Sequence, residues 1–141
     1  MTGIVDLSVL LAQMRPALTE GEFVFCTFPD KDVRSHLHLA PVGMFVEEEG
    51  LTLVVERSVA EGNRIDCSAP FRRIVLTVHS SLEAVGLTAA VATALANRGI
   101  SANMIAAFHH DHIFVPSDRA EAALAALHAC QKEASDMQRG Q

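Results

Sequence analysis

The sequence predicts an α+β fold in which two similar units each place helices on one face of an antiparallel sheet. Apolar residues alternate with period two in several short segments and recur with helical spacing in others. An order of strand, helix, hairpin and helix occurs twice along the chain. The length of 141 residues, with half of them hydrophobic, allows one compact body or two very small ones.

The first half is expected to contain a helix, a strand and a hairpin. Apolar side chains spaced along one helical face predict a short helix between Asp6, a capping residue, and Pro16, which would end it. Residues 22–28 are rich in β-branched and aromatic side chains and predict a strand. Residues 43–56 predict a hairpin that turns next to Gly50.

The second half repeats this order. Gly99 follows the expected middle helix, at a position where a left-handed residue is common, and Asp118 with Glu121 resembles a capping box. The expected elements are a strand over 71–79, a helix from about 85 to 98, strands over 100–108 and 112–116 around a turn near Asp111, and a final amphipathic helix that begins at Ser117 or Asp118.

The order of these elements matches a ferredoxin-like plan. Crossover helices would lie on one face of a mainly antiparallel sheet in each βαββαβ unit. Residues 1–70 would form the first unit and residues 71–141 the second. Because the first half begins on a helix and the second half ends on one, each half lacks a strand. We therefore infer that one strand is shared, with 22–28 as the candidate.

The composition disfavours several classes of partner. A net charge of -6 and a single basic pair, Arg72 and Arg73, disfavour nucleic-acid binding, which depends on clustered basic side chains. The sequence contains no Trp and no Tyr, so the large aromatic faces of single-strand nucleic-acid sites are missing. No stretch approaches the roughly 20 apolar residues of a membrane span, and no basic leader precedes the first apolar run. We expect a cytoplasmic protein without a membrane partner.

The reactive residue types do not form a recognisable catalytic pattern. Cys26, Cys67 and Cys130 are odd in number and widely spaced, so we expect small core side chains rather than a disulfide framework or a zinc ribbon. No G-x-S-x-G motif occurs, and Ser, His and Asp follow no familiar catalytic order. We therefore expect no enzyme, no catalytic residues and no cofactor, although triads can occur in any chain order.

Four sequence features occur together in the second half of the chain. They are a strand that ends in His79, Ser80 and Ser81, the glycine at position 86, the phrase NRGISANMI, and a hairpin that leads to VPSDRAEAAL. In this combination residues 74–129 resemble an ACT domain, the small-molecule-binding regulatory unit attached to aspartokinases and other amino-acid enzymes. No Gly-rich phosphate loop of a kinase is present. The resemblance therefore implies a sensor without its enzyme.

The first half also carries a resemblance. Its phrase PVGMFVEEEGLTLVV is similar to the divergent ACT unit of a group of small, free-standing bacterial proteins, in which a second ACT unit follows. This likeness spans nearly the whole chain. It implies two ACT units in tandem.

The resemblance also implies an effector site. In ACT domains an effector amino acid usually lies between paired units, held by the loop between the first strand and helix and by the start of the second strand. Exposed N–H groups at a helix start suit a carboxylate, and Glu83 would meet an ammonium or guanidinium group. The corresponding residues are His79, Ser80, Ser81, Leu82, Glu83, Ala84, Val85, Gly86 and Leu87, with Asn103, Met104 and Ile105 opposite.

The same residues have plainer interpretations. Ser80 and Glu83 have the spacing of a capping box, and sequence alone does not separate capping from ligand contact. Gly86 would either let a ligand approach the backbone or permit close packing of the helix on the sheet. Both alternatives stay open at this point.

A histidine cluster supplies the rival hypothesis. His109, His110 and His112 flank Asp111, and imidazole with carboxylate can bind zinc or nickel. Strand alternation would send His110 and His112 to one face and His109 to the other, so at most two ring nitrogens converge. The plainer interpretation is a hairpin turn at Asp111 with hydrogen-bonded or pH-sensing histidines. We expect no metal ligands.

The leading hypothesis is a regulatory protein of tandem ACT architecture. It would bind a free amino acid, and the ligand would stabilise the packing of the units, of a homodimer or of a complex with a regulated enzyme. The second hypothesis is a ligand-free interaction module that uses an exposed sheet edge. The third is a metal or pH sensor at residues 109–112.

Overall fold

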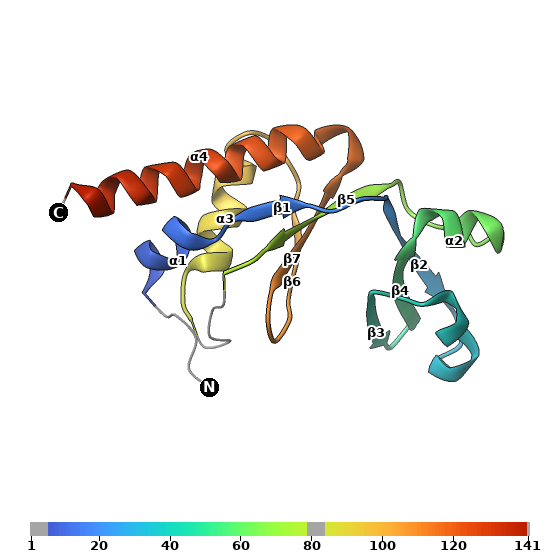
Figure 1. Cartoon of the computed structure of the whole chain (residues 1–141). Helices are drawn as coiled ribbons and strands as arrows, with labels where there is room; N and C mark the ends of the chain where they lie inside the picture. The colour runs from blue at the N-terminus through green and yellow to red at the C-terminus, as the bar shows by residue number, and fades with distance from the viewer. Residues whose placement is uncertain (1–5, 79–83, 141) are drawn as a thin grey trace. The chain divides into compact units, whose positions relative to one another are not determined.

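The computed structural model describes residues 6–78 and 84–140, and the chain divides into two compact units (Figure 1). Unit 1 comprises residues 1–19 and 73–141, and unit 2 comprises residues 20–72. This division differs from the sequence halves 1–70 and 71–141, because the N-terminal segment packs with the second half of the chain. The assignment of one family unit to each half stays a prediction.

Over its described residues, unit 1 combines a sheet with three α-helices and one short 3-10 helix. Its strands follow the order β1-β5-β7-β6, with β1 antiparallel to β5 and β6 antiparallel to β7. Figure 1 shows the long helix α4 beside α1 and β1. The elements are α1 (Leu7–Gln13), β1 (Pro16–Leu18), most of β5 (Phe71–Leu76), α3 (Leu87–Ala96), β6 (Asn103–Ala106), β7 (Asp111–Pro116), the 3-10 helix η2 (Ser117–Arg119) and α4 (Ala120–Arg139).

The helices of unit 1 cover one face of its sheet. Ile74 on β5 and Ile113 on β7 are fully buried and pack with apolar side chains of α1, α3 and α4 in one core cluster. Since side chains alternate along a strand, the residues next to Ile74 on β5 and next to Ile113 on β7 face the other side of the sheet. The sequence prediction of helices on one face of an antiparallel sheet is confirmed.

Local signals in unit 1 agree with the expected boundaries. The Asp6 carboxylate accepts a hydrogen bond from the Val9 amide at 3.2 Å and caps α1. Gly99, after α3, has a left-handed backbone with φ of 69°. Both predictions are confirmed, because each depends on residues only a few positions apart.

Two local predictions are wrong. Asp111 does not form the turn but is the buried first residue of β7, and the chain reverses over residues 107–110. The proposed capping box of Asp118 and Glu121 is absent, because the one-turn helix η2 precedes α4. The N-cap of α4 is therefore Arg119, which makes no side-chain capping bond.

Unit 2 has a three-stranded antiparallel sheet in the order β3-β4-β2. The first residue of β5 extends it, since Phe71 pairs with Phe23. Its core contains the buried residues Leu51, Leu53 and Val55, which the alternation in the sequence placed on one face. The elements are β2 (Phe23–Phe28), the 3-10 helix η1 (Val33–Leu39), β3 (Gly43–Glu47), β4 (Gly50–Glu56) and α2 (Arg57–Gly62).

Strand β5 is divided between the two units. It begins in unit 2 and continues into unit 1, where β1 pairs with it in the register Pro16↔Leu76. Residues 22–28, the candidate for a shared strand, contain β2 and lie wholly within unit 2, so the strand that both units use is β5 instead.

Within the described residues, no helix is both long and apolar enough to cross a lipid bilayer.

Candidate functional site

The predicted effector loop lies only partly within the described residues. His79, Ser80, Ser81, Leu82 and Glu83 lie outside them. The remaining residues of the loop lead directly into α3. Val85 is 84% exposed, Ala84 and Gly86 are half-buried, and Leu87 is buried.

Gly86 shapes the start of α3. Its backbone is left-handed with φ of 100°, and its carbonyl accepts the first helical hydrogen bond, from the Ala90 amide at 2.9 Å. A Cβ atom at this position would lie 3.1 Å from Cδ2 of Leu7. The glycine therefore serves both backbone conformation and close packing, and its neighbour is helix α1 rather than the sheet.

The predicted residues on β6 divide between the two faces of the sheet. Met104 packs against the core cluster of unit 1, as does Ala84, and Leu87 belongs to that cluster. Asn103 and Ile105 alternate with Met104 and so lie on the opposite face. The side-chain nitrogen Nδ2 of Asn103 donates a hydrogen bond to the Phe114 carbonyl oxygen at 3.4 Å. Met104, Ala84 and Leu87 thus pack in or against the same core cluster, whereas Asn103 and Ile105 do not.

The histidine cluster does not follow strand alternation. His109 and His110 precede β7 and are exposed, with their ring centroids 6.4 Å apart. His112 lies within β7 and is half-buried, and its Nδ1 has no hydrogen-bond partner among the described residues. Over residues 6–78 and 84–140, no three side chains of the metal-ligating types gather in a way that could hold a metal ion.

Burial is the largest cause of the pKa shifts of Asp111 and His112 at the start of β7. It raises the pKa of Asp111, and the nearby His110 acts in the opposite direction. Burial is also the largest cause that lowers the pKa of His112, and the positive charges of Arg73 and His110 lower it further. Both residues therefore favour their neutral forms more than exposed residues of the same type do.

Replacing Asp111 with asparagine tests this burial penalty. The pKa of Asp111 in the folded state lies above the ordinary value of 3.8. Protonation of Asp111 therefore favours the folded state, and the protein loses stability as the pH rises through the folded-state pKa. We expect Asp111→Asn to raise Tm at about pH 7 and to bring no gain at about pH 3. Thermal unfolding followed by circular dichroism measures both. The exposed Asp118→Asn is the control, and an equal gain at both pH values would contradict the assignment.

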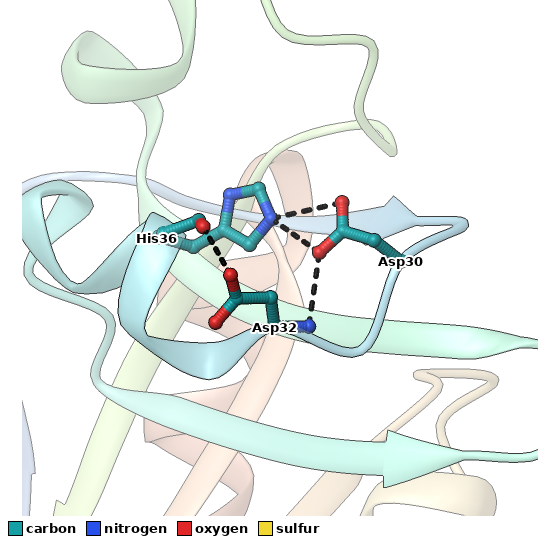
Figure 2. A network of polar contacts seen from close by, with 4 residues as sticks. Asp30, Asp32 and His36 are labelled. Atoms are coloured by element: carbon teal, nitrogen blue, oxygen red, sulfur yellow. Dashed lines mark hydrogen bonds and ion pairs between the residues drawn. The ribbon is translucent and has the colours of Figure 1, made fainter.

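A polar network that the sequence analysis missed lies after β2 (Figure 2). The His36 Nε2 atom is 3.1 Å and 3.2 Å from the two Asp30 carboxylate oxygens, and the imidazole stacks on Phe28 with centroids 4.0 Å apart. Asp30 also accepts from the Asp32 amide at 3.0 Å, while Asp32 accepts from the Ser35 hydroxyl at 2.6 Å. These contacts stabilise the turn into η1.

The same contacts act on the Asp30 carboxyl group. The Asp32 amide is the largest cause that lowers the pKa of Asp30, and the hydrogen bond with His36 adds to it. The signal in the sequence is an Asp-x-Asp-x-x-Ser-His pattern that follows a strand. Asx turns of this kind are local, so the pattern identifies a turn more readily than a ligand site.

Unit 2 also contains an acidic surface cleft of about 600 Å³ that the sequence did not indicate. The Arg57 guanidinium pairs with Glu22 at 2.8 Å and with Glu61 at 2.7 Å. Carboxylates outnumber this one cation, so the cleft favours positively charged groups. Its lining residues are Glu20, Gly21, Glu22, Glu56, Arg57, Ser58 and Glu61.

A second cleft, of about 300 Å³, lies between α3 and α4 in unit 1. Its lining includes small side chains such as Ala94 and Ala126, together with the charged residues Arg98 and Glu133. Neither cleft is lined by residues 84–87 or 103–105. The described members of the predicted effector set, residues 84–87 and 103–105, therefore form no part of these two clefts.

Comparisons with known proteins agree with this architecture. Models of the ACT domain match residues 2–72 and residues 68–129. A protein of unknown function from Vibrio cholerae, a possible transport protein, is 50% identical with a TM-score of 0.81, and the match covers 89% of this chain and 95% of that chain. No curated protein matches the sequence.

Two more distant solved structures share the fold. The ligand-free regulatory subunit of aspartate kinase from Thermus thermophilus is 15% identical with a TM-score of 0.64, over 82% of this chain and 95% of that chain. A protein from Agrobacterium tumefaciens is 16% identical with a TM-score of 0.65, over 82% of this chain and 87% of that chain.

Proposed function

Because the chain belongs to the ACT domain family, we propose that it is a regulatory protein that binds a free amino acid. ACT domains are regulatory units that bind small molecules. The structure of aspartokinase III from E. coli, which shares the fold at 15% identity and a TM-score of 0.59, contains aspartate and ADP. That structure also contains a kinase, since the match covers only 32% of its chain. The likeness to the regulatory subunit of aspartate kinase from Thermus thermophilus therefore gives the stronger support for an amino acid as the class of effector.

The start of α3 carries the proposal. The Ala90 amide donates the first hydrogen bond of α3, to the Gly86 carbonyl oxygen. The amides of residues 87–89 therefore lie in the first turn, ahead of the residues that donate within the helix. Gly86 has no side chain with which to cap them, and Thr88 and Ala89 are exposed to solvent. Such amides, at the positive end of a helix dipole, suit the carboxylate of an amino acid.

Glu83 supplies the complementary charge in this proposal. A free amino acid carries an ammonium group next to its carboxylate, and a glutamate four residues before the helix can pair with it. The ligand would then join the loop to α3. Regulation follows if the liganded state packs better against a second copy or a regulated enzyme.

Thermal unfolding in the presence of each of the twenty amino acids tests the proposal. A ligand at about 100 times its Kd stabilises the folded state by about 2.7 kcal/mol, which corresponds to a Tm increase of roughly 5–10 °C for a chain of this length. We expect a selective increase with one amino acid or with a few related ones. An unchanged Tm across the panel at millimolar concentration would contradict the proposal.

Two variants locate the site. Glu83→Gln should remove most of the ligand-dependent increase, because the ammonium group loses its partner. Glu48→Gln changes an exposed residue of the β3–β4 turn and should leave the increase intact. If both variants retain the full increase, the ligand binds elsewhere, and the acidic cleft around Arg57 becomes the next place to search.

One observation favours a second candidate function, a ligand-free interaction module. Strand β3 is the last strand in the order β3-β4-β2, and Met44, Phe45 and Val46 on it are 42%, 52% and 59% exposed. Exposed apolar edge strands can pair with other chains. Light scattering separates the candidates: an oligomer that no amino acid alters favours this function, and a monomer at all concentrations contradicts it.

A further inference from the structure

Two cysteines that lie far apart in the sequence meet in unit 2. Cys26 on β2 and Cys67, in the segment after α2, are partners in an isolated antiparallel bridge. Residues directly opposite each other on antiparallel chains place their side chains on the same face. Both thiols are free in this structure.

The hydrogen bonds beside the bridge define its type. The Ser68 amide donates to the Phe25 carbonyl at 2.9 Å, and the Phe25 amide donates to the Ser68 hydroxyl at 2.9 Å. The backbone bond therefore joins the neighbours of the cysteines, which makes Cys26 and Cys67 a non-hydrogen-bonded pair. Such pairs have Cα atoms about 4.5 Å apart, within the usual disulfide range of about 4.4–6.8 Å.

The two thiols have different surroundings. Cys26 is 3% exposed and packs in the core of unit 2 with Leu53 and its neighbours, whereas Cys67 is exposed. The sequence prediction of three core cysteines is therefore wrong for Cys67. Burial raises the pKa of Cys26 to about 11, and the proximity of Cys67 contributes to this increase. Cys67 is thus the thiol that a dissolved oxidant reaches first, with Cys26 held behind it.

We propose that Cys26 and Cys67 form a reversible disulfide when the protein meets a low-molecular-weight disulfide such as oxidised glutathione. The bond would fasten the segment that follows α2 onto β2. It would act within unit 2 alone, since both residues belong to that unit. This inference does not depend on the identity of an amino-acid effector.

The exchange balances in two steps. The Cys67 thiolate attacks one sulfur of oxidised glutathione, forms a mixed disulfide and releases one glutathione thiolate. Cys26 then loses its proton to solvent, and its sulfur attacks the Cys67 sulfur and releases the second glutathione. Two protein thiols are oxidised to one disulfide, and one glutathione disulfide is reduced to two thiols.

Closing this loop of about 40 residues restricts the unfolded chain, so the oxidised protein should unfold at a higher temperature. We expect Tm to rise by roughly 10 °C after incubation with excess oxidised glutathione, and to return after addition of dithiothreitol. Mass spectrometry after alkylation should find one alkylated thiol, Cys130, and the loss of two hydrogen atoms.

Three variants complete the test. Cys67→Ser changes an exposed side chain and should fold normally but lose the oxidation-dependent rise in Tm. Cys26→Ser should lose it as well, and Cys130→Ser, in unit 1, should retain it. Three alkylated thiols at excess oxidised glutathione, a stable glutathione adduct at Cys67, or a dimer linked through Cys67 would each overturn the proposal.

Discussion

Gly50→Ala should lower the free energy of unfolding by about 3 kcal/mol. Gly50 begins β4 with φ of 149°, and a Cβ atom there would lie 2.1 Å from the Phe28 carbonyl oxygen and 3.2 Å from Cα of Pro29. These are backbone atoms at the end of β2, so no side-chain rotation relieves the overlap. The pairing of β2 with β4 would have to open at this end.

Denaturant-induced unfolding followed by circular dichroism measures this effect. Gly62→Ala is the matched control, because Gly62 ends α2 and a Cβ atom there would meet nothing within 4 Å. Alanine is favoured over glycine in a helix, so the control should be neutral or should stabilise the protein by up to about 1 kcal/mol. Equal midpoints for the two variants would show that β2 and β4 do not approach closely at Gly50.

Leu53→Ala should cost about 3 kcal/mol, within the usual range of about 2–5 kcal/mol for truncation of a buried leucine. Leu53 is 1% exposed on the central strand β4, between β3 and β2. Its side chain packs in the small core of unit 2 with Val24 and Val55. Because this core has few members, a cavity there removes a large share of its contacts.

Leu37→Ala provides the comparison within the same unit. Leu37 lies on η1 and is 55% exposed, so its truncation should change the free energy of unfolding by less than about 0.5 kcal/mol. Both variants remove the same atoms, and the difference between them isolates burial. If Leu53→Ala cost no more than Leu37→Ala, the core assignment for unit 2 would be wrong.

The sequence predicted some local features around the candidate site and missed others, and the effector residues themselves stay a prediction. The middle helix was expected from about residue 85 and begins at Leu87, close to the prediction, because Gly86 and the helical pattern after it are visible locally. The pairing of Cys26 with Cys67 was not, since spacing along the chain says nothing about which segments become neighbours. The contact of Gly86 with Leu7 was missed for the same reason.

The amino-acid sequence by itself determined the local elements. The Asp6 cap of α1, the hairpin of β3 and β4, and the left-handed Gly99 after α3 all follow from residues within one or two turns of each other. Tertiary structure alone decided that β1 pairs with β5, that β5 continues from unit 2 into unit 1, and that Asp111 is buried at the start of β7. Strand partners are selected by the apolar surface that distant segments bury together, and a local pattern fixes only which face of a strand is apolar.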